Sequence, residues 1–272
     1  MLIKRVRRGW LIVVTILALL GCGEANHEDK LMTNVQISVA EWQALAKKRV
    51  VFGHQSVGQN ILDGVQSLAA QAGIGIQVKE SRGAVTDGAG IVHFSVGRNK
   101  FPDSKFKDFT ETLENGLGNS ADIALMKLCY VDFKADTDAT LLADQYSAML
   151  DRLSRQFPHT AFITVTTPLT TVQTGLIAWF KRLLGLEPDG YAENARRKEF
   201  NDLLRTRYGQ QGYLFDLAKI ESEGFNVPNY QERSIEALNP ALTTDGGHLN
   251  AEGEKQVAVQ LVKLLAALPS KR

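Results

Sequence analysis

The chain has few of the residues that form disulfides or ligate metals. Its 272 residues contain two cysteines and five histidines, and no His-x-x-x-His or paired-carboxylate spacing indicates a catalytic metal. No internal repeat or low-complexity tract divides the chain, so no repeat architecture is expected. Neither a metal nor another cofactor is therefore expected.

The first 21 residues have the layout of a bacterial lipoprotein signal peptide. A basic head over residues 4–8 precedes an apolar run over 9–21, which is shorter than the ~20 residues that span a bilayer. The string Leu19-Leu20-Gly21-Cys22 resembles a lipobox, which implies cleavage before Cys22 and a diacylglyceryl thioether on its sulfur. The alternative is an uncleaved membrane anchor with an incidental cysteine. Gly23 is not the Asp that retains lipoproteins at the inner membrane, so the outer membrane, facing the periplasm, is favoured.

Cleavage would leave a polar tether over residues 22–34 and a domain over 35–272. Removing residues 1–21 takes away four basic and no acidic residues, leaving 27 Lys and Arg against 30 Asp and Glu, a net charge of −3. That balance argues against a nucleic-acid partner, which needs a clustered basic face. The remaining 251 residues are enough for one α/β domain with a full core.

Apolar runs alternate with amphipathic stretches along the domain. Helical spacing predicts helices over 57–72, 141–157, 193–208 and 250–268. Continuous apolar runs predict strands over 49–53, 74–78, 122–131, 161–167 and 213–217. Such strands between helices indicate a single α/β domain with a flavodoxin-like, five-stranded parallel sheet and helices on both faces.

Several polar residues follow the predicted strands directly. Ser56 comes after the first strand, Asp132 after the third, and residues 166–171 after the fourth. Because ligands bind outside the carboxyl ends of parallel strands, these segments should face one site.

Two stretches exceed what a minimal α/β unit needs. Residues 83–118 form a long connection rich in glycine and charge, and residues 170–190 contain a short apolar-basic helix candidate over 175–185. Long excursions are often functional loops or lids. The alternative for the second is a packed surface helix that covers core.

Three residues could carry catalysis. Ser56 needs a base to take its proton, His248 can act as that base, and Asp245, three residues before it, can orient the imidazole. Each has a structural alternative: a helix cap for Ser56, a turn with Gly246 for Asp245, and a surface loop for His248. The order, with Ser early and Asp-x-x-His late, favours the catalytic interpretation.

This order resembles the SGNH (GDSL-like) hydrolase superfamily over about residues 50–265. The resemblance depends on Ser56 after the first strand and on the string Asp245-Gly-Gly-His248-Leu-Asn-Ala-Glu-Gly253. It implies that Ser56 is the nucleophile, His248 the base and Asp245 its orienting partner.

The oxyanion hole departs from the family pattern. The Gly-Asp-Ser block is His54-Gln55-Ser56 here, and Val131 stands where the Gly-x-Asn-Asp block has its Asn. The backbone N–H of Ser56, at a helix start, is one expected donor. Gly97 and Asn99 are the other candidates, with an ordinary Gly-Asn turn as their alternative.

Other reactive side chains have structural explanations. Cys129 lies in an apolar run and is expected to be a core residue, with a nucleophilic role as the minor alternative. His54 and His93 lack metal-ligand spacing. Lys127 either pairs with a buried carboxylate or emerges at a strand end.

The function expected is that of an envelope-anchored serine hydrolase acting on acyl or acetyl esters of small molecules, lipids or glycans. Its membrane partner would be reached through the lipid on Cys22. The alternatives are a non-catalytic lipoprotein that keeps the fold to bind a glycan or an envelope partner, and an acetyltransferase of the same superfamily.

Overall fold

A computed structural model describes residues 36–83, 88–227 and 229–269. Residues 37–272 form one compact unit. The signal peptide and tether expected over residues 1–34 lie outside the described residues. Within the described ranges, no helix combines the length and apolarity that crossing a bilayer requires.

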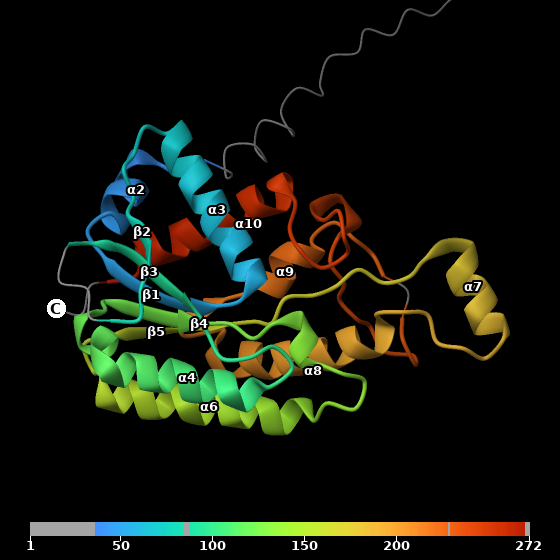
Figure 1. Ribbon diagram of the computed structural model, residues 1–272. Helices are drawn as coiled ribbons and strands as arrows, with labels where there is room; N and C mark the ends of the chain where they lie inside the picture. The colour runs from blue at the N-terminus through green and yellow to red at the C-terminus, as the bar shows by residue number, and fades with distance from the viewer. Residues whose placement is uncertain (1–35, 84–87, 228, 270–272) are drawn as a thin grey trace, which may run out of the picture. The chain divides into compact units, whose positions relative to one another are not determined.

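The sheet has six parallel strands in the order β2-β3-β1-β4-β5-β6 (Figure 1). Their bounds are Val78–Glu80 for β2, Gly90–Ser95 for β3, Arg49–His54 for β1, Ile123–Met126 for β4, Ala161–Val165 for β5 and Leu214–Phe215 for β6. Without the short edge strand β2, the order is that of a flavodoxin-like sheet. The predicted fold class is therefore confirmed.

The count of five strands was wrong. The sixth strand is β3, which lies in the stretch over 83–118 that was expected to be a connection. Half-buried His93 interrupts its apolar pattern, so β3 lacks the continuous apolar run that predicted the other strands. The strand expected over 74–78 begins only at Val78.

Helices cover both faces of the sheet (Figure 1). On one face lie α2 (Val39–Leu45), α3 (Ser56–Gln71), α9 (Leu217–Ser222) and α10 (Ala251–Ala267). On the other lie α4 (Pro102–Thr112), α6 (Ala139–Gln156) and α8 (Tyr191–Tyr208). The four predicted helices are confirmed as α3, α6, α8 and α10, each bound lying within two residues of its prediction, whereas α2, α4 and α9 were not predicted.

Helices α3 and α10 approach each other closely at Gly64. A Cβ atom at Gly64 would lie 2.4 Å from the backbone oxygen of Glu254, so only glycine permits this approach. The N-terminal end of α3 carries Ser56, and α10 begins three residues after His248. Packing of the two helices therefore helps to bring together residues 192 positions apart.

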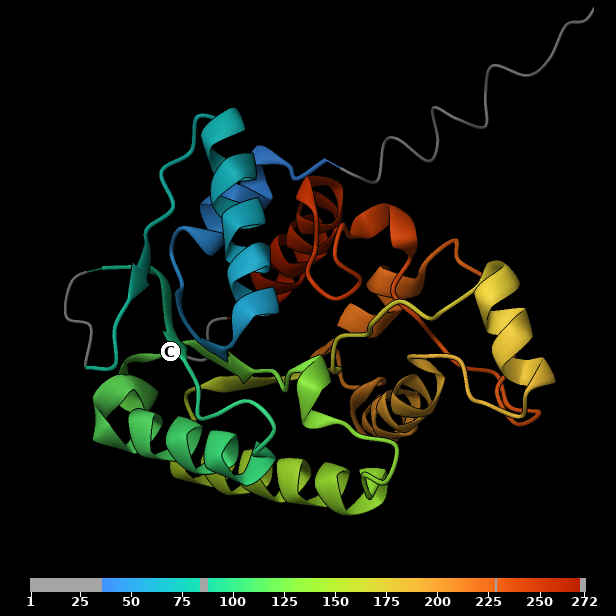
Figure 2. The same ribbon diagram turned by 45° about the vertical axis from the view of Figure 1, so that its right-hand side comes forward.

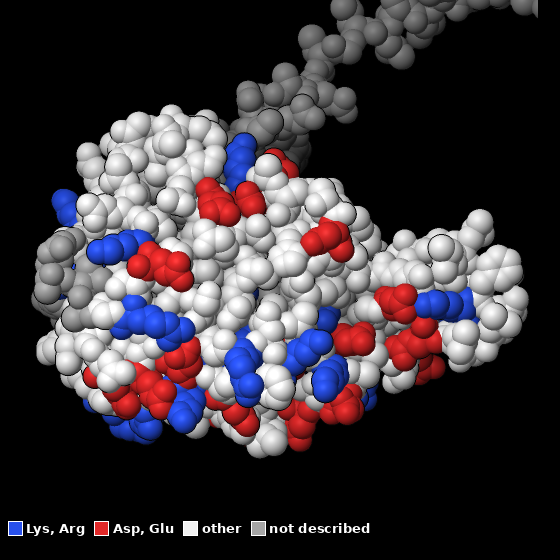
Figure 3. Space-filling view, in the orientation of Figure 1, with Lys and Arg blue, Asp and Glu red and all other residues white. Residues whose placement is uncertain are grey.

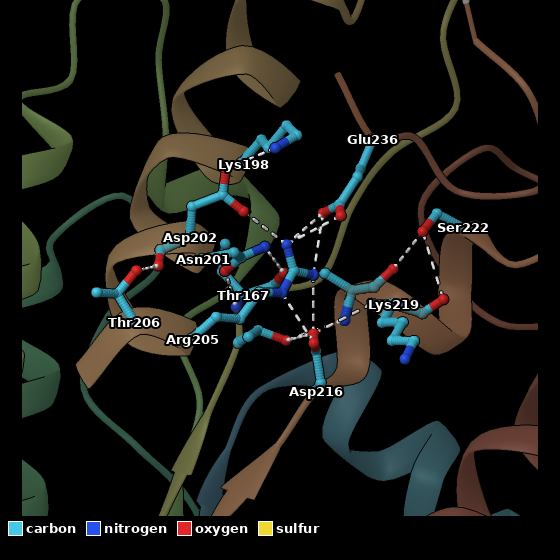
Figure 4. A network of polar contacts seen from close by, with 12 residues as sticks. Thr167, Lys198, Asn201, Asp202, Arg205, Thr206, Asp216, Lys219, Ser222 and Glu236 are labelled. Atoms are coloured by element: carbon cyan, nitrogen blue, oxygen red, sulfur yellow. Dashed lines mark hydrogen bonds and ion pairs between the residues drawn. The ribbon is translucent and has the colours of Figure 1, made fainter. Parts of the chain in front are cut away.

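The segment after β5 is held by an ion-pair network centred on Arg205 of α8 (Figure 4). The Arg205 guanidinium forms a bidentate ion pair with Asp216, at 2.8 and 2.9 Å, and also binds Glu236 at 2.9 Å. Two residues further on, the Leu238 N–H donates to the Thr170 carbonyl at 3.0 Å. The network thus connects α8 and α9 with the chain that leaves β5.

The two long excursions differ. In the first, the described residues 88–118 contain β3 and α4, which belong to the body of the domain. The second contains α7 (Gly175–Leu183), in which Ala178 is the buried residue. Because its large apolar side chains are exposed, α7 does not cover core as the structural alternative required.

Candidate active site

Ser56 lies at the carboxyl end of the central strand β1, as the first residue of α3. The chain crosses to β3 on one side of β1 and to β4 on the other, and such a switch point is where ligands bind in parallel sheets. The turn before Ser56 is tied to the end of β3, because the Val96 N–H donates to His54 O at 2.9 Å and Gln55 Nε2 donates to Val96 O at 2.7 Å. Ser56 itself is exposed.

The turn into α3 also depends on Gly58. A Cβ there would lie 2.2 Å from the Cβ of His54, so the helix can fold back over the buried His54 side chain only with glycine at this position. The ordinary helix-start signal of a Ser, Thr, Asp or Asn cap is absent, since the capping residue Gln55 makes no side-chain cap bond. Ser56 is therefore free to use its hydroxyl elsewhere.

The structure brings Ser56, His248 and Asp245 into one hydrogen-bonded chain. His248 Nδ1 lies 2.6 Å from Asp245 Oδ2, and His248 Nε2 lies 2.9 Å from Ser56 Oγ. A carboxylate only accepts, so the neutral imidazole carries its proton on Nδ1, and Nε2 is left to accept from the serine hydroxyl. This is the arrangement that a nucleophile, base and orienting acid require.

The carboxylate of Asp245 is fixed by the turn that follows it. Its Oδ1 accepts from the backbone N–H of Gly247 at 2.9 Å and of His248 at 2.8 Å. Hydrogen bonds hold the pKa of Asp245 well below its usual range. The largest effect comes from the backbone N–H of His248, followed by the His248 side chain and the backbone N–H of Gly247. Asp245 is thus ionised at neutral pH, and its side chain is half exposed.

Two further contacts shape this turn. Gly246 has a φ of +87°, a left-handed conformation that side chains rarely adopt, and its carbonyl accepts from the Thr171 N–H at 2.9 Å. Thr243 and Leu249 pair across the turn as an antiparallel bridge. The Asp-x-x-His segment is therefore a closed loop attached to the chain that leaves β5.

Tyr130 is a site residue that the sequence did not single out. Its ring meets the imidazole of His248, and its hydroxyl lies 3.5 Å from His248 Nε2. Gly247 permits this contact, since a Cβ there would lie 2.8 Å from Tyr130 Cζ. The Tyr130 carbonyl accepts from the buried guanidinium of Arg197 at 3.0 and 3.2 Å. The only sequence signal was its place at the end of the third predicted strand.

The candidate oxyanion donors differ in whether their N–H groups are already hydrogen-bonded. The backbone N–H groups of Ser56 and Val57 lie in the first turn of α3 and bond to nothing else in the described part of the chain. Gly97 is not free, because its N–H donates to Asp108 Oδ2 at 2.7 Å. Asn99 accepts from Lys105 Nζ at 3.0 Å through Oδ1, and its NH₂ group has no partner among the described residues. Ser56 and Asn99 thus remain as expected donors, and Gly97 is removed from the set.

Asp132 serves the fold beneath the site. Its carboxylate forms an ion pair of 2.5 Å with Lys105, and both side chains are fully buried. It also accepts from the N–H groups of Lys100 at 2.8 Å and Cys129 at 2.7 Å. These bonds join the loop after β3 to the loop after β4. Cys129 is buried in this arrangement, as expected of a core residue.

The remaining candidates are structural. His54 Nδ1 donates to the Gln55 carbonyl at 2.8 Å, so its Nε2 accepts from His93 Nδ1 at 3.0 Å, and burial lowers the pKa of His54 to about 4. Lys127 is fully buried, and burial lowers its pKa to about 8. Its nearest acceptor is the Leu128 carbonyl at 3.5 Å. Lys127 therefore neither pairs with a buried carboxylate nor emerges at a strand end, which were the two situations expected from the sequence. No group of three or more potential metal ligands occurs within residues 36–83, 88–227 and 229–269.

No family model and no curated protein matches the sequence. Solved structures are similar in fold at 12% identity. A protein from Desulfitobacterium hafniense DCB-2 assigned to the G-D-S-L family of lipolytic proteins has a TM-score of 0.47 and covers 80% of this chain and 99% of its own. The periplasmic domain of a lipopolysaccharide acetyltransferase from Salmonella ser. Paratyphi A has a TM-score of 0.40, covering 82% of this chain and 86% of its own.

Proposed function

We propose that this protein is an SGNH-type serine hydrolase that cleaves acyl or acetyl esters. The observation that supports it most is the unbroken chain from Asp245 through His248 to Ser56, with contacts of 2.6 and 2.9 Å. A helix cap or a turn explains one of these residues at a time. Neither explains why residues 192 positions apart meet with the hydrogen-bond polarity of a triad.

In this proposal Ser56 Oγ attacks the ester carbonyl carbon while its proton moves to His248 Nε2. The negative charge that develops on the carbonyl oxygen is stabilised by N–H groups at the start of α3, with the Asn99 amide as the expected side-chain donor. Collapse of the intermediate breaks the bond to the alcohol oxygen, which takes the proton from His248. Water, activated by the same imidazole, then releases the acid and restores Ser56.

The half-exposed side chains of Asp245 and His248 favour hydrolysis over transfer, because water reaches the base directly. The test is turnover of p-nitrophenyl acetate by the wild type and by Ser56→Ala. Loss of the attacking oxygen should lower kcat/KM by several orders of magnitude with an unchanged melting temperature. An active wild type matched by an equally active Ser56→Ala protein would rule out this mechanism, and a wild type inactive on a panel of acyl and acetyl esters would favour the non-catalytic alternative.

We also propose that the mature protein begins at a lipidated Cys22. The support is the basic head, the short apolar run and the Leu-Leu-Gly-Cys string. Cys22→Ser should leave an uncleaved precursor or release the protein from membranes. Mass spectrometry of the wild-type N-terminus checks the proposal, and an unmodified Cys22 in the mature protein would refute it.

A further inference from the structure

Helix α7 presents its apolar side chains to solvent. Successive residues of a helix are about 100° apart, so the large apolar residues of α7 and its C-terminal cap fall on one continuous arc of about 160°. They are all more than half exposed, from 55% for Trp179 to 76% for Leu176. This arc consists of Leu176, Ile177, Trp179, Phe180, Leu183 and Leu184. An ordinary surface helix buries such an arc and exposes its polar residues.

The opposite side of α7 faces the domain and holds the helix in this orientation. Ala178 is 1% exposed, the Arg182 guanidinium lies 5.1 Å from the ring centre of Tyr191, and Lys181 Nζ lies 2.8 Å from Asp189. These contacts secure the inner face of α7 while leaving the apolar arc outward. In both views of the ribbon α7 stands apart from the other helices (Figures 1 and 2).

The composition of α7 suits an anionic lipid surface. No acidic residue occurs from Gly175 to Leu186, and the two charges in that stretch are Lys181 and Arg182. Figure 3 shows α7 as an almost uncharged projection, with charged residues where it joins the body. An apolar arc with aromatic residues and flanking cations is typical of helices that lie in the interface of a bilayer.

The base of α7 adjoins the candidate active site. The Gln173 N–H donates to the Asp189 carbonyl at 3.0 Å, which closes the stem of the excursion. Two residues before Gln173, Thr171 donates to the carbonyl of Gly246, in the turn that carries Asp245 and His248. A surface that binds α7 would therefore lie beside the triad.

We propose that α7 is a membrane-docking helix whose apolar arc inserts into the interface of a bilayer containing anionic lipids. The chain outside the described residues supports this occupant over a second copy of the protein. The expected lipid attachment at Cys22 is fourteen residues before Gln36, and fourteen extended residues span at most about 50 Å. A domain held that close to a bilayer would meet lipid before it met another molecule. Docking of α7 does not depend on ester hydrolysis.

The experiment uses residues 23–272, which include the whole compact unit and lack the signal peptide and lipid. This chain has two tryptophans, of which Trp42 is buried and Trp179 is exposed on α7, so a blue shift of emission reports on α7. Binding is measured by flotation with vesicles of phosphatidylcholine, with and without phosphatidylglycerol. The variant is Leu176→Glu with Leu183→Glu, and the control is Leu141→Glu on α6, where the leucine is 55% exposed.

We expect the wild type and Leu141→Glu to float with the anionic vesicles and to show the blue shift. The α7 double variant should bind about tenfold less or weaker still, because two apolar side chains no longer insert. Ser56→Ala should bind like the wild type, which separates docking from catalysis. A wild type that binds neither vesicle, or a double variant that binds as the control does, would overturn the proposal. So would a dimer in analytical ultracentrifugation that the α7 double variant dissociates.

Discussion

The ring of Tyr130 meets the imidazole of His248 edge to face, with ring centroids 5.8 Å apart and planes inclined by 75°. Gly247, the residue before His248, has no side chain, and this allows the Tyr130 ring to approach. The Arg197 guanidinium holds the backbone of Tyr130 by donating to the Tyr130 carbonyl oxygen. His248 is therefore oriented by two groups: Asp245 fixes its tautomer, and Tyr130 limits the tilt of its ring.

Tyr130→Phe should keep most of the ester-cleaving activity, because the edge-to-face contact survives and the hydroxyl is 3.5 Å from His248 Nε2. Tyr130→Ala removes the ring and should lower kcat by about tenfold to a hundredfold, with a smaller change in KM, since a misplaced base costs rate. Steady-state kinetics of both variants check this. Equal activities of the two variants would show that the ring does not position His248.

Asp245→Asn should lower kcat/KM by about 10³–10⁴-fold, as in other triads. The amide NH₂ of the new side chain would face His248 Nδ1, which would place the imidazole proton on Nε2, opposite Ser56. His248→Ala should be at least as severe, because it removes the base. Wild-type activity should fall as the solution is acidified, since a protonated imidazole cannot accept the Ser56 proton. The acid decline is not due to Asp245, whose pKa is held far below its usual range by its bonds to His248 and Gly247.

These variants are measured as kcat/KM against pH, together with a thermal melt. Folded variants that retain near wild-type activity throughout would identify Asp245 and His248 as turn residues.

Asp132→Asn should lower the free energy of unfolding by about 3–5 kcal/mol, because it leaves the fully buried ammonium of Lys105 without a counter-charge. Adding Lys105→Met to that variant should restore part of the loss, since no unpaired charge then remains. Urea unfolding of the two proteins measures the difference. A single variant as stable as the wild type would mean that the buried pair contributes nothing to the fold.

The contribution of His54 to stability should decline as the pH falls from about 6.5 to about 4, by about 3 kcal/mol. Burial lowers the pKa of His54 to about 4, so within this window the unfolded chain binds a proton that the folded protein does not. The half-buried His93 contributes with the same sign, because burial lowers its pKa as well. The charged groups that act on these imidazoles are Lys127 near His54, and Glu80 and Asp63 near His93.

The measurement is the pH slope of the unfolding free energy between pH 5 and 7, compared between the wild type and a His54 variant. The comparison is needed because burial raises the pKa of Glu221 to about 8, so the folded protein binds a proton there in this range and the contribution has the opposite sign. His54→Asn should make this slope less positive, whereas His159→Gln, at an exposed position, should leave it unchanged. An unchanged slope in His54→Asn would show that His54 is not the group responsible.

The fold class could be predicted, and Ser56, Asp245 and His248 could be singled out as one candidate site, because their signals are local. Continuous apolar strands indicate a doubly covered parallel sheet, and Ser56 and the Asp245-to-His248 string each lie within a few residues of an element boundary. The strand β3 could not be found in that way, since His93 breaks its apolar run and makes its hydrogen bond to a residue 39 positions away.

The oxyanion donors depend on contacts that no short motif specifies. Gly97 has the residue type and the place of a donor, yet its N–H is taken by Asp108, a residue of the helix α4 that was not predicted. Tyr130 has no catalytic residue type for this reaction, and only packing reveals that it lies against His248. In both cases the missing information was which element packs over the site.

The most direct test of the account is covalent labelling by a fluorophosphonate, which reacts with a serine only when a neighbouring base activates it. The wild type, Ser56→Ala, His248→Ala and Leu141→Glu are incubated with the probe, and the labelled residue is located by peptide mass spectrometry. We predict one phosphonyl group on Ser56 in the wild type and in Leu141→Glu, and none in Ser56→Ala or His248→Ala. A folded wild type that stays unlabelled, or that is labelled equally well when His248 is replaced, would contradict the proposal that Ser56 is an activated nucleophile.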